Sequence, residues 1–239
     1  MKIVADLHTH TIASTHAYST ISENTLCAKE QGLKAIAMTD HAPKMPDSPH
    51  IWHFDAMVIL PRYINDVMVI RGAEANCMDI NGTIDLPRYT LDRLEWIVAS
   101  LHGPCIKPGT IEENTQTYIN LANNKEVDVI GHATTAEYKW DFEVGIKEIA
   151  KTGTFMELNE NSINGSFAYE NAKIMLDVCK KYGVGICIDT DSHFCQKIGK
   201  IPNSTRLLSE IDFPQELIIN ADWDRLKSHI ISKRPDALQ

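Results

Sequence analysis

The sequence of 239 residues predicts an α/β fold in which seven parallel strands alternate with helices and form a barrel. Three observations support this prediction: short apolar runs recur along the chain, helical patterns lie between most of them, and polar residues follow every run. The strands are expected to be parallel because each helical crossover returns the chain to the same end of the sheet. Seven such steps favour closure into a barrel, and an open sheet is the alternative that the sequence leaves.

The apolar runs are four or five residues long and most are rich in Val and Ile, which favours buried strands over helices. In chain order the runs are KIVA from Lys2, KAIAM from Lys34, VMVI from Val67, WIVAS from Trp96, VDVI from Val127, TFMEL from Thr154 and VGICI from Val184. No linker or low-complexity segment separates them, so we expect one domain over residues 1–239.

The expected helices begin and end at recognisable capping residues. They cover residues 22–31, a segment that begins at Thr110, and residues 141–151, 169–182 and 222–233. Thr110 is followed three residues later by Glu113, which is the capping-box pattern. Three of the segments end at or just before a glycine (Gly32, Gly153 or Gly183), as is common after the last turn of a helix.

The composition argues against several classes of function. A net charge of -9 disfavours general nucleic-acid binding, because phosphate backbones are held by Lys and Arg. No apolar run approaches the ~18 residues of a membrane-spanning helix, and the chain reaches polar residues too early for a signal peptide. The six cysteines form no C-x-x-C pair, which favours reduced thiols over a disulfide framework. We therefore expect a cytoplasmic protein without a membrane or nucleic-acid partner.

Each apolar run is followed by side chains that can bind a metal ion or carry a proton. In chain order these are Asp6, His8 and His10; Asp40 and His41; Glu74; His102; His132; Asn159 to Asn161; and Asp189, Asp191 and His193. The carboxyl ends of parallel barrel strands meet at one mouth, where active sites lie. We therefore expect these residues to lie close together, with His16 brought back to them by a loop.

Nine of these residues are candidate metal ligands: His8, His10, His16, His41, Glu74, His102, His132, Asp191 and His193. Imidazole and carboxylate groups suit zinc and other divalent ions. A closed tetrahedral site needs four ligands, so nine predict a cluster of two or three ions with a bridging carboxylate. Asp6 and Asp40 adjoin these ligands and are expected to orient them through hydrogen bonds. The role of His53 is left open between a lid and a rim residue.

The ordered motifs DLHTH, TDH, GAEAN and DSH, with a single His after the fourth and fifth strands, resemble the PHP family, named for polymerase and histidinol phosphatase domains. The strings ASTHAYST, PHIWHF and GAEANC are similar to a branch of probable phosphatases known as YcdX-like. The resemblance runs from the first strand to the closing helix. It implies a distorted (β/α)7 barrel with parallel strands, which carries three zinc ions at the carboxyl ends of its strands.

The resemblance also implies how the ligands divide among the ions. The first ion would take His8, His10, Glu74 and Asp191; the second His16, His41 and His193; and the third would share Glu74 and take His102 and His132. Mn²⁺ or Fe²⁺ are alternatives to zinc. The branch often reads HPGNP after the fifth strand, whereas this chain reads HATTAEY. His132 is kept, but the loop beside it differs, which leaves the substrate preference open.

The expected function is that of a metal-dependent phosphatase, a hydrolase of phosphoric ester bonds that acts on small-molecule phosphate monoesters. The nucleophile would be a metal-bound hydroxide at the cluster, so no Ser or Cys nucleophile is needed. Arg62 and Lys44 are candidates for binding the substrate phosphate, and solvated surface charge is the alternative for both. Whether the protein forms a homo-oligomer is left open.

Three other functions are compatible with the same residues. A phosphodiesterase or exonuclease of the same family is disfavoured by the negative charge. A metal-dependent amidohydrolase usually needs a metal-bridging Lys at a strand end, and no strand here ends in one. A non-catalytic zinc-binding protein would hold metal tightly and hydrolyse no ester.

Overall fold

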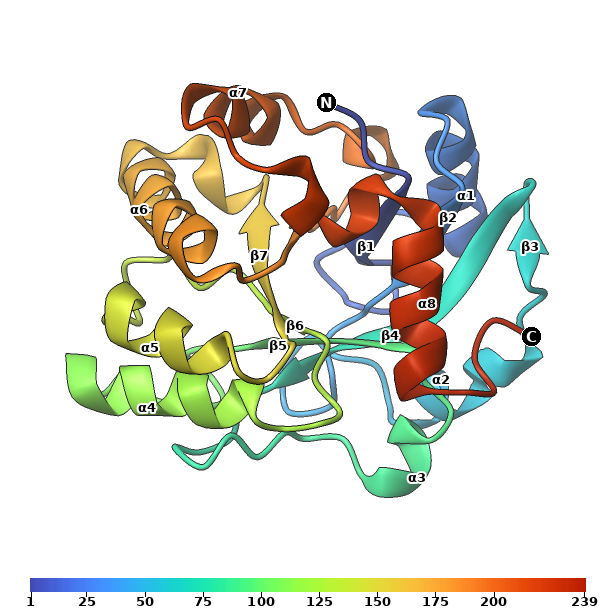
Figure 1. The fold of residues 1–239 in the computed structure, drawn as a ribbon. Helices are drawn as coiled ribbons and strands as arrows, with labels where there is room; N and C mark the ends of the chain where they lie inside the picture. The colour runs from blue at the N-terminus through green and yellow to red at the C-terminus, as the bar shows by residue number, and fades with distance from the viewer.

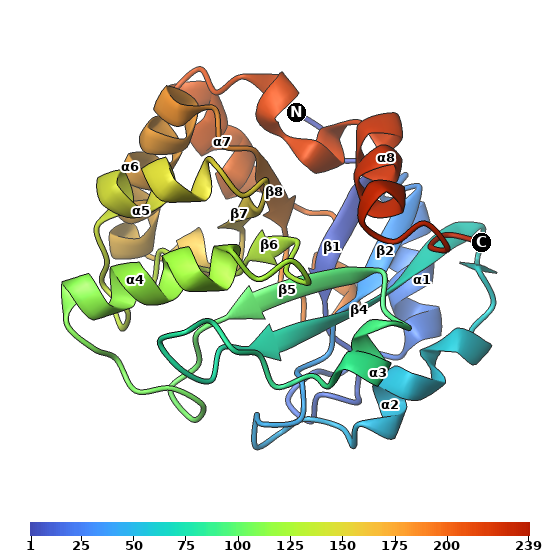
Figure 2. The same cartoon turned by 60° about the horizontal axis from the view of Figure 1, so that its bottom comes forward.

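The computed structural model describes residues 1–239 and contains a sheet of seven parallel strands rolled nearly into a barrel (Figures 1 and 2). The parallel strands are β1 (Ala5–Thr9), β2 (Ala35–Met38), β4 (Val67–Asn76), β5 (Trp96–Ser100), β6 (Val129–Ile130), β7 (Phe155–Asn159) and β8 (Ile186–Asp189). They pair in chain order. A short strand β3 (Tyr63–Ile64) adds an antiparallel partner to the start of β4. The predicted fold class is confirmed, and a nearly closed sheet replaces the open alternative.

Eight helices surround the sheet. They are α1 (Ile21–Glu30), α2 (Trp52–Asp55), α3 (Arg88–Leu91), α4 (Ile111–Ala122), α5 (Phe142–Ile149), α6 (Ser166–Tyr182), α7 (Pro202–Glu210) and α8 (Trp223–Lys233). The capping box expected at Thr110 is present, and α1 has another at Thr20. None of the helices has the length and apolar character needed to cross a membrane.

Helix α7 was not predicted because its own sequence carries no N-terminal cap. Its N-cap residue, Ile201, makes no side-chain hydrogen bond. Glu160, in the loop after β7, instead accepts hydrogen bonds from the backbone N–H groups of Asn203 and Ser204 at 3.0 and 2.8 Å. A remote carboxylate thus satisfies the first turn of the helix.

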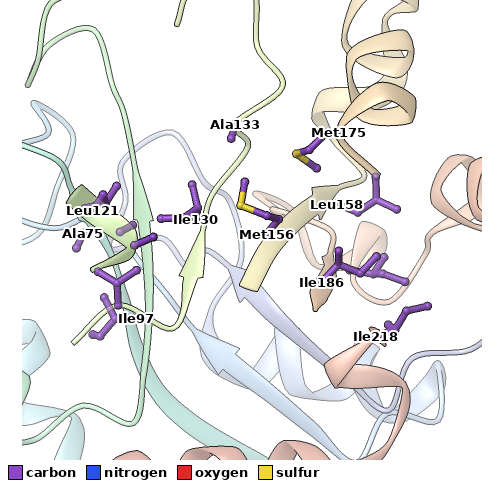
Figure 3. Close-up of a cluster of buried hydrophobic side chains, with 14 of the residues drawn as sticks. Ala75, Ile97, Leu121, Ile130, Ala133, Met156, Leu158, Met175, Ile186 and Ile218 are labelled. Atoms are coloured by element: carbon purple, nitrogen blue, oxygen red, sulfur yellow. The ribbon is translucent and has the colours of Figure 1, made fainter. Parts of the chain in front are cut away.

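Two hydrophobic clusters lie on opposite sides of the sheet. The larger one, of 46 buried residues, fills the space between the strands and the surrounding helices. Figure 3 shows part of it, with Ile97 and Met156 on strands and Leu121 and Met175 on α4 and α6. The smaller cluster of 14 residues fills the barrel, and Leu226 of α8 belongs to it. Helix α8, in front of the strands in Figure 1, therefore closes the end of the barrel where the strands begin.

Strand β1 changes register near its carboxyl end. Asp6 faces Ile36 of β2, but Thr9 faces Met38, so β1 carries one extra residue between the two pairs. This irregularity has the effect of a β-bulge, which re-aims the side chains that follow it. Leu7 and His8 consequently both face the barrel interior: Leu7 packs in the inner cluster, and His8 contacts Glu74 and Glu157.

The seam between β1 and β8 is closed by side chains rather than by a regular ladder. The backbone N–H of Leu7 donates to Asp189 Oδ1 at 2.7 Å. The buried amide of Asn220 donates to the carbonyl oxygens of Ala5 and Ile188, at 2.9 and 2.7 Å. These contacts satisfy the edges of two strands that would otherwise present unpaired backbone groups inside the protein.

Candidate metal centre

The nine candidate ligands lie together at the carboxyl ends of the strands, which we call the mouth of the barrel. Their rings are closely spaced, with centroid distances of 4.2 Å between His10 and His193 and 4.5 Å between His10 and His41. His16 reaches the group from the loop before α1, 4.4 Å from His193, although half of its side chain is exposed. The parallel topology therefore gathers side chains that are up to 185 positions apart in sequence.

Glu74, near the end of β4, lies at the centre of this group. Its Oε1 atom is 2.9 Å from His132 Nε2 and 3.3 Å from His102 Nε2. Its Oε2 atom is 2.9 Å from His41 Nδ1, without hydrogen-bond geometry, and 3.4 Å from His8 Nε2. The two carboxylate oxygens thus face two different pairs of imidazoles, which is the arrangement that a bridging carboxylate requires.

The charges of the group shift pKa values in both directions. Burial raises the pKa of Glu74, but the nearby imidazoles, His8 foremost, outweigh burial and hold it well below its usual range. Burial lowers the pKa of His8, but Glu157 and Glu74 bring it well above its usual value. Burial lowers the pKa of His193 to about 4, and the charge of His10 adds to this effect. A neutral imidazole is the form that binds a metal.

Several buried polar atoms of the group have no hydrogen-bond partner. They are His8 Nε2, His10 Nδ1, both ring nitrogens of His41, His193 Nε2 and Glu74 Oε2. An unpaired buried polar atom costs about 1–3 kcal/mol, and native structures contain few of them. Imidazole nitrogen and carboxylate oxygen are ligand atoms for zinc and similar ions. The residues present therefore fit a group of divalent metal ions.

Four sets of three side chains place their ligand atoms within 4.8 Å of one another. They are His8, His10 and Asp191; His10, His41 and His193; His16, His41 and Asp47; and His41, Glu74 and His102. The sets share His10 and His41, so they form one connected centre. The division of ligands among particular ions stays a prediction.

Two candidate ligands have backbone conformations that non-glycine residues rarely adopt. The φ angles of His132 and Asp191 are +28° and +49°. Such conformations cost free energy and persist where neighbouring groups hold them. Glu157 Oε2 accepts the His132 N–H at 2.6 Å, and the Asn159 amide donates to Asp191 Oδ2 at 3.2 Å. Both contacts come from β7, which therefore fixes the direction of two candidate ligands on neighbouring loops.

Sequence reasoning missed three residues of the centre. Glu157 Oε1 lies 2.6 Å from His8 Nδ1, Asn76 Oδ1 lies 2.7 Å from His102 Nδ1, and Asp47 Oδ2 lies 2.8 Å from His16 Nδ1. The first two had a detectable signal: Glu157 is an acid within an apolar run, and Asn76 lies two residues after Glu74 on the same face of a strand. Asp47 lies in a loop, and no feature of the sequence marked it as part of the centre.

Asp40 and Asp6 make hydrogen bonds to loops rather than to the candidate ligands' imidazoles. Asp40 accepts hydrogen bonds from the backbone and hydroxyl groups of Thr11 and Ser14, and His53 Nε2 lies 3.1 Å from it. Burial raises the pKa of Asp40, but His53 leads the contacts that lower it to about 2. Asp6 holds the backbone of Thr190 and Gly199. Any orienting effect on the candidate ligands passes through these loops.

Arg62, a candidate for binding the substrate phosphate, does not lie at the candidate metal centre. Its guanidinium makes a double hydrogen bond with Glu95, at 2.7 and 2.8 Å, and also donates to the carbonyl oxygen of Val69. Arg62 directly precedes the β3–β4 hairpin, so it lies where strands begin, at the end of the barrel opposite the mouth. Lys44 is exposed in the loop after β2 and forms no ion pair, and its role stays a prediction.

The fold is a barrel of parallel strands, and its mouth carries a histidine-rich centre of the kind that binds metal ions. These two features define a class of α/β barrel proteins rather than a single activity. Comparison with known proteins narrows the class: a model of the PHP domain matches residues 6–201, and the chain belongs to the PHP family. The predicted family resemblance is thereby confirmed.

Individual proteins similar to this chain extend the comparison. A probable phosphatase of Clostridium acetobutylicum is 41% identical over 235 residues, which are 98% of this chain and 96% of that protein. A probable phosphatase of Clostridium novyi is 43% identical over the same lengths. Among solved structures, histidinol phosphate phosphatase from Lactococcus lactis, in complex with zinc, L-histidinol and phosphate, is 17% identical with a TM-score of 0.62, and the match covers 88% of this chain and 94% of that chain. That identity supports the shared fold alone.

Proposed function

We propose that this protein is a metal-dependent phosphatase that hydrolyses small-molecule phosphate monoesters at a centre of three zinc ions. The observation that carries the proposal is Glu74, whose two oxygens face separate pairs of imidazoles within a group of nine candidate ligands. Relatives named probable phosphatases, at 41% and 43% identity over nearly the whole chain, support the reaction class. The zinc and phosphate bound by the Lactococcus lactis enzyme support the choice of metal and ligand.

In this proposal Glu74 would help to hold two ions. On its Oε2 side, His8 and His10 would hold the first ion with Asp191. On its Oε1 side, His102 and His132 would hold another. The remaining imidazoles, His16, His41 and His193, would hold the third, and Asp47 is a further candidate beside His16.

Bound divalent ions supply Lewis-acid chemistry: they polarise phosphoryl oxygens, neutralise developing charge and lower the pKa of a water. The chain's own residues prepare the site for this chemistry. Glu157 and Asn76 accept from the far ring nitrogens of His8 and His102, which leaves each Nε2 atom free to face Glu74. Asp40 holds the loop that carries His16. Lys44, exposed on the loop after β2, is available to a substrate phosphate.

The proposal is tested by assaying the purified protein on p-nitrophenyl phosphate, bis-p-nitrophenyl phosphate and p-nitroacetanilide, with metal analysis of the same sample. We expect turnover of the monoester far above that of the diester and none of the amide. Removal of metal by a chelator should abolish turnover, and added zinc or manganese should restore it. Replacing His10 by Ala should remove activity, whereas Glu112→Gln on the exposed face of α4 should not.

Preferred hydrolysis of the diester would favour a phosphodiesterase, and hydrolysis of the amide would favour an amidohydrolase. Bound metal without turnover of any ester would leave a zinc-binding protein. Full activity after metal removal would contradict the mechanism altogether. Once monoester hydrolysis is established, a screen of phosphorylated metabolites identifies the substrate.

A further inference from the structure

A cavity lies at the end of the barrel opposite the mouth. Its volume is about 1170 Å³, and its walls include Glu95, Val127 and Thr154, which lie one or two residues before β5, β6 and β7. Further walls come from α3, Arg71 of β4, the loops before β6 and β7, the last turn of α8 and the segment that follows it. Figure 2 shows α3 and α8 on the side where β4 and β5 begin. The metal centre is formed by the opposite ends of the same strands, so the two sites are separate.

The charge of this cavity differs in sign from that of the molecule. Its lining contains seven Lys or Arg residues and four Asp or Glu residues. When the ion-pair partners just outside the lining are counted, Arg62, Glu148 and Asp128, an excess of two positive charges remains. The whole chain carries a net charge of -9. A concave surface of one sign, set in a protein of the other, concentrates ligands of opposite charge.

Most of the acidic groups in the lining already have partners. Arg88 pairs with both Asp92 and Glu126. Glu95 is held by Arg62, which lies outside the cavity, at 2.7 Å. These carboxylates therefore do little to neutralise the other cations of the lining.

Several cationic groups of the lining lack an acceptor. Arg71 and Lys125 form no ion pair, and Arg93 contacts only the carbonyl oxygen of Asp55, at 3.3 Å. Arg234 is held by the buried Asp128 at 3.0 Å, but its Nε–H group is buried without a partner. The cavity thus presents unpartnered N–H donors and few free acceptors, which is what an anionic ligand requires.

We propose that this cavity binds a small molecule that carries two or more phosphate groups, of the size of a nucleoside diphosphate. The volume slightly exceeds the ~300–1,000 Å³ common for small-molecule sites, so both a diphosphate and an organic group fit. Guanidinium groups bind phosphate through paired hydrogen bonds, and Arg71 and Arg93 supply two of them. The proposal uses no residue of the metal centre and does not depend on phosphatase activity.

The test is calorimetric titration of the zinc-loaded full-length protein with α,β-methylene adenosine diphosphate, whose bridging carbon resists hydrolysis. Arg93→Glu with Lys125→Glu should weaken binding by about tenfold or more, because two charge-assisted contacts become repulsive. Lys147→Glu with Lys227→Glu makes the same change in net charge on exposed helix faces away from the cavity and should leave binding unchanged. Arg93 and Lys125 are exposed, so the fold should tolerate their replacement, and thermal unfolding checks this.

A further variant locates the bound probe. His10→Ala removes a residue of the metal centre and should leave the affinity for the probe unchanged. Loss of binding in His10→Ala, with binding retained in the Arg93 and Lys125 variant, would place the probe at the mouth and overturn the proposal. Absence of measurable binding to the wild-type protein at millimolar probe would overturn it as well. Phosphatase activity of the cavity variant reports separately on the proposed function.

Discussion

The side chain of Glu74 contacts several of the candidate ligands of the centre. Its carboxylate is 1% exposed and lies within 3.4 Å of four imidazoles. The rule that polar residues follow barrel strands selected Glu74 and seven other candidate ligands from the sequence, and His16 was added as a residue of the loop after the first strand. The same rule could not select Asp47, because its contact with His16 depends on how two loops fold over each other.

Replacing Glu74 by Gln keeps the shape of the side chain and removes its negative charge. We expect the variant to retain fewer zinc ions per chain than the wild type and to lose about a hundredfold or more of its phosphatase activity, because a neutral amide does not bridge cations. Inductively coupled plasma mass spectrometry and p-nitrophenyl phosphate turnover measure the two effects. An unchanged zinc content in Glu74→Gln would rule out the bridging role.

Glu157 acts on the centre from behind His8. Glu157→Gln should reduce zinc affinity by about ten- to a hundredfold, because the imidazole loses the carboxylate that fixes its orientation and raises its basicity. Competition with a chromophoric chelator measures this change. Glu143→Gln, on the exposed side of α5, is the matched control. Equal zinc affinities in the two variants would argue that Glu157 only fills space in the barrel.

At the scale of elements, the sequence pattern predicted the strands better than their irregularities. The alternation of residues along β1 predicts that His8 and His10 share one face, and both imidazoles lie within 3.6 Å of Glu74 Oε2. It could not reveal the extra residue between Asp6 and Thr9, which turns both Leu7 and His8 inward. The pattern also missed α7, because the cap of that helix comes from Glu160 on another loop.

Asp128 holds the carboxyl end of α8 against the barrel. This fully buried carboxylate lies 2.9 Å from Lys233 Nζ, 3.0 Å from Arg234 Nη2 and 3.2 Å from His229 Nε2. Burial raises the pKa of Asp128, but the hydrogen bond from His229 and the charges of Arg234 and Lys233 hold it well below its usual range. This contact explains why the side chain of His229 is mostly buried.

Asp128→Asn should lower the free energy of unfolding by about 3 kcal/mol at pH 7, because two partly buried cations lose their fully buried charged partner. A depressed pKa in the folded state contributes stability above the unfolded value of about 4, and this contribution disappears as the pH falls through the folded value. The difference in free energy of unfolding between wild type and variant should therefore become smaller from pH 5 towards pH 2. Urea unfolding followed by circular dichroism measures this difference, with the exposed Asp177→Asn as control. A difference that does not change with pH would contradict the assignment.

The overall fold is an alternation of strands and helices, and this alternation was predictable from the sequence. The position of Arg62 was not, because the chain between β2 and β4 travels back past α2 to the end of the barrel where β4 begins. A residue between two strands of the sequence can lie at either end of the barrel. Which end it occupies depends on the path of the chain between the strands. Closure of the barrel was predicted from the number of strands, but the contacts that close it, from the side chains of Asp189 and Asn220, could not be predicted.

Metal removal should affect the stability of the whole molecule. Ions that bind only the folded state stabilise it by mass action, and their loss leaves the buried, unpaired atoms of the centre uncompensated. We expect a chelator to lower the unfolding temperature by about 5 °C or more, and added zinc to restore it. Differential scanning calorimetry measures this shift. Identical unfolding curves with and without chelator would show that the centre binds no stabilising ion.

The seam between β1 and β8 also determines when the barrel can close during synthesis of the chain. Leu7 bonds to a residue 182 positions later, and Ala5 to one 215 positions later. Chains emerge from the ribosome amino end first, so β1 keeps an open edge until nearly the whole polypeptide has been made. His8 and His10 then have neither Asp191 nor His193 beside them. We expect metal loading to follow release of the finished chain, and a nascent chain arrested at residue 185 to hold no such centre.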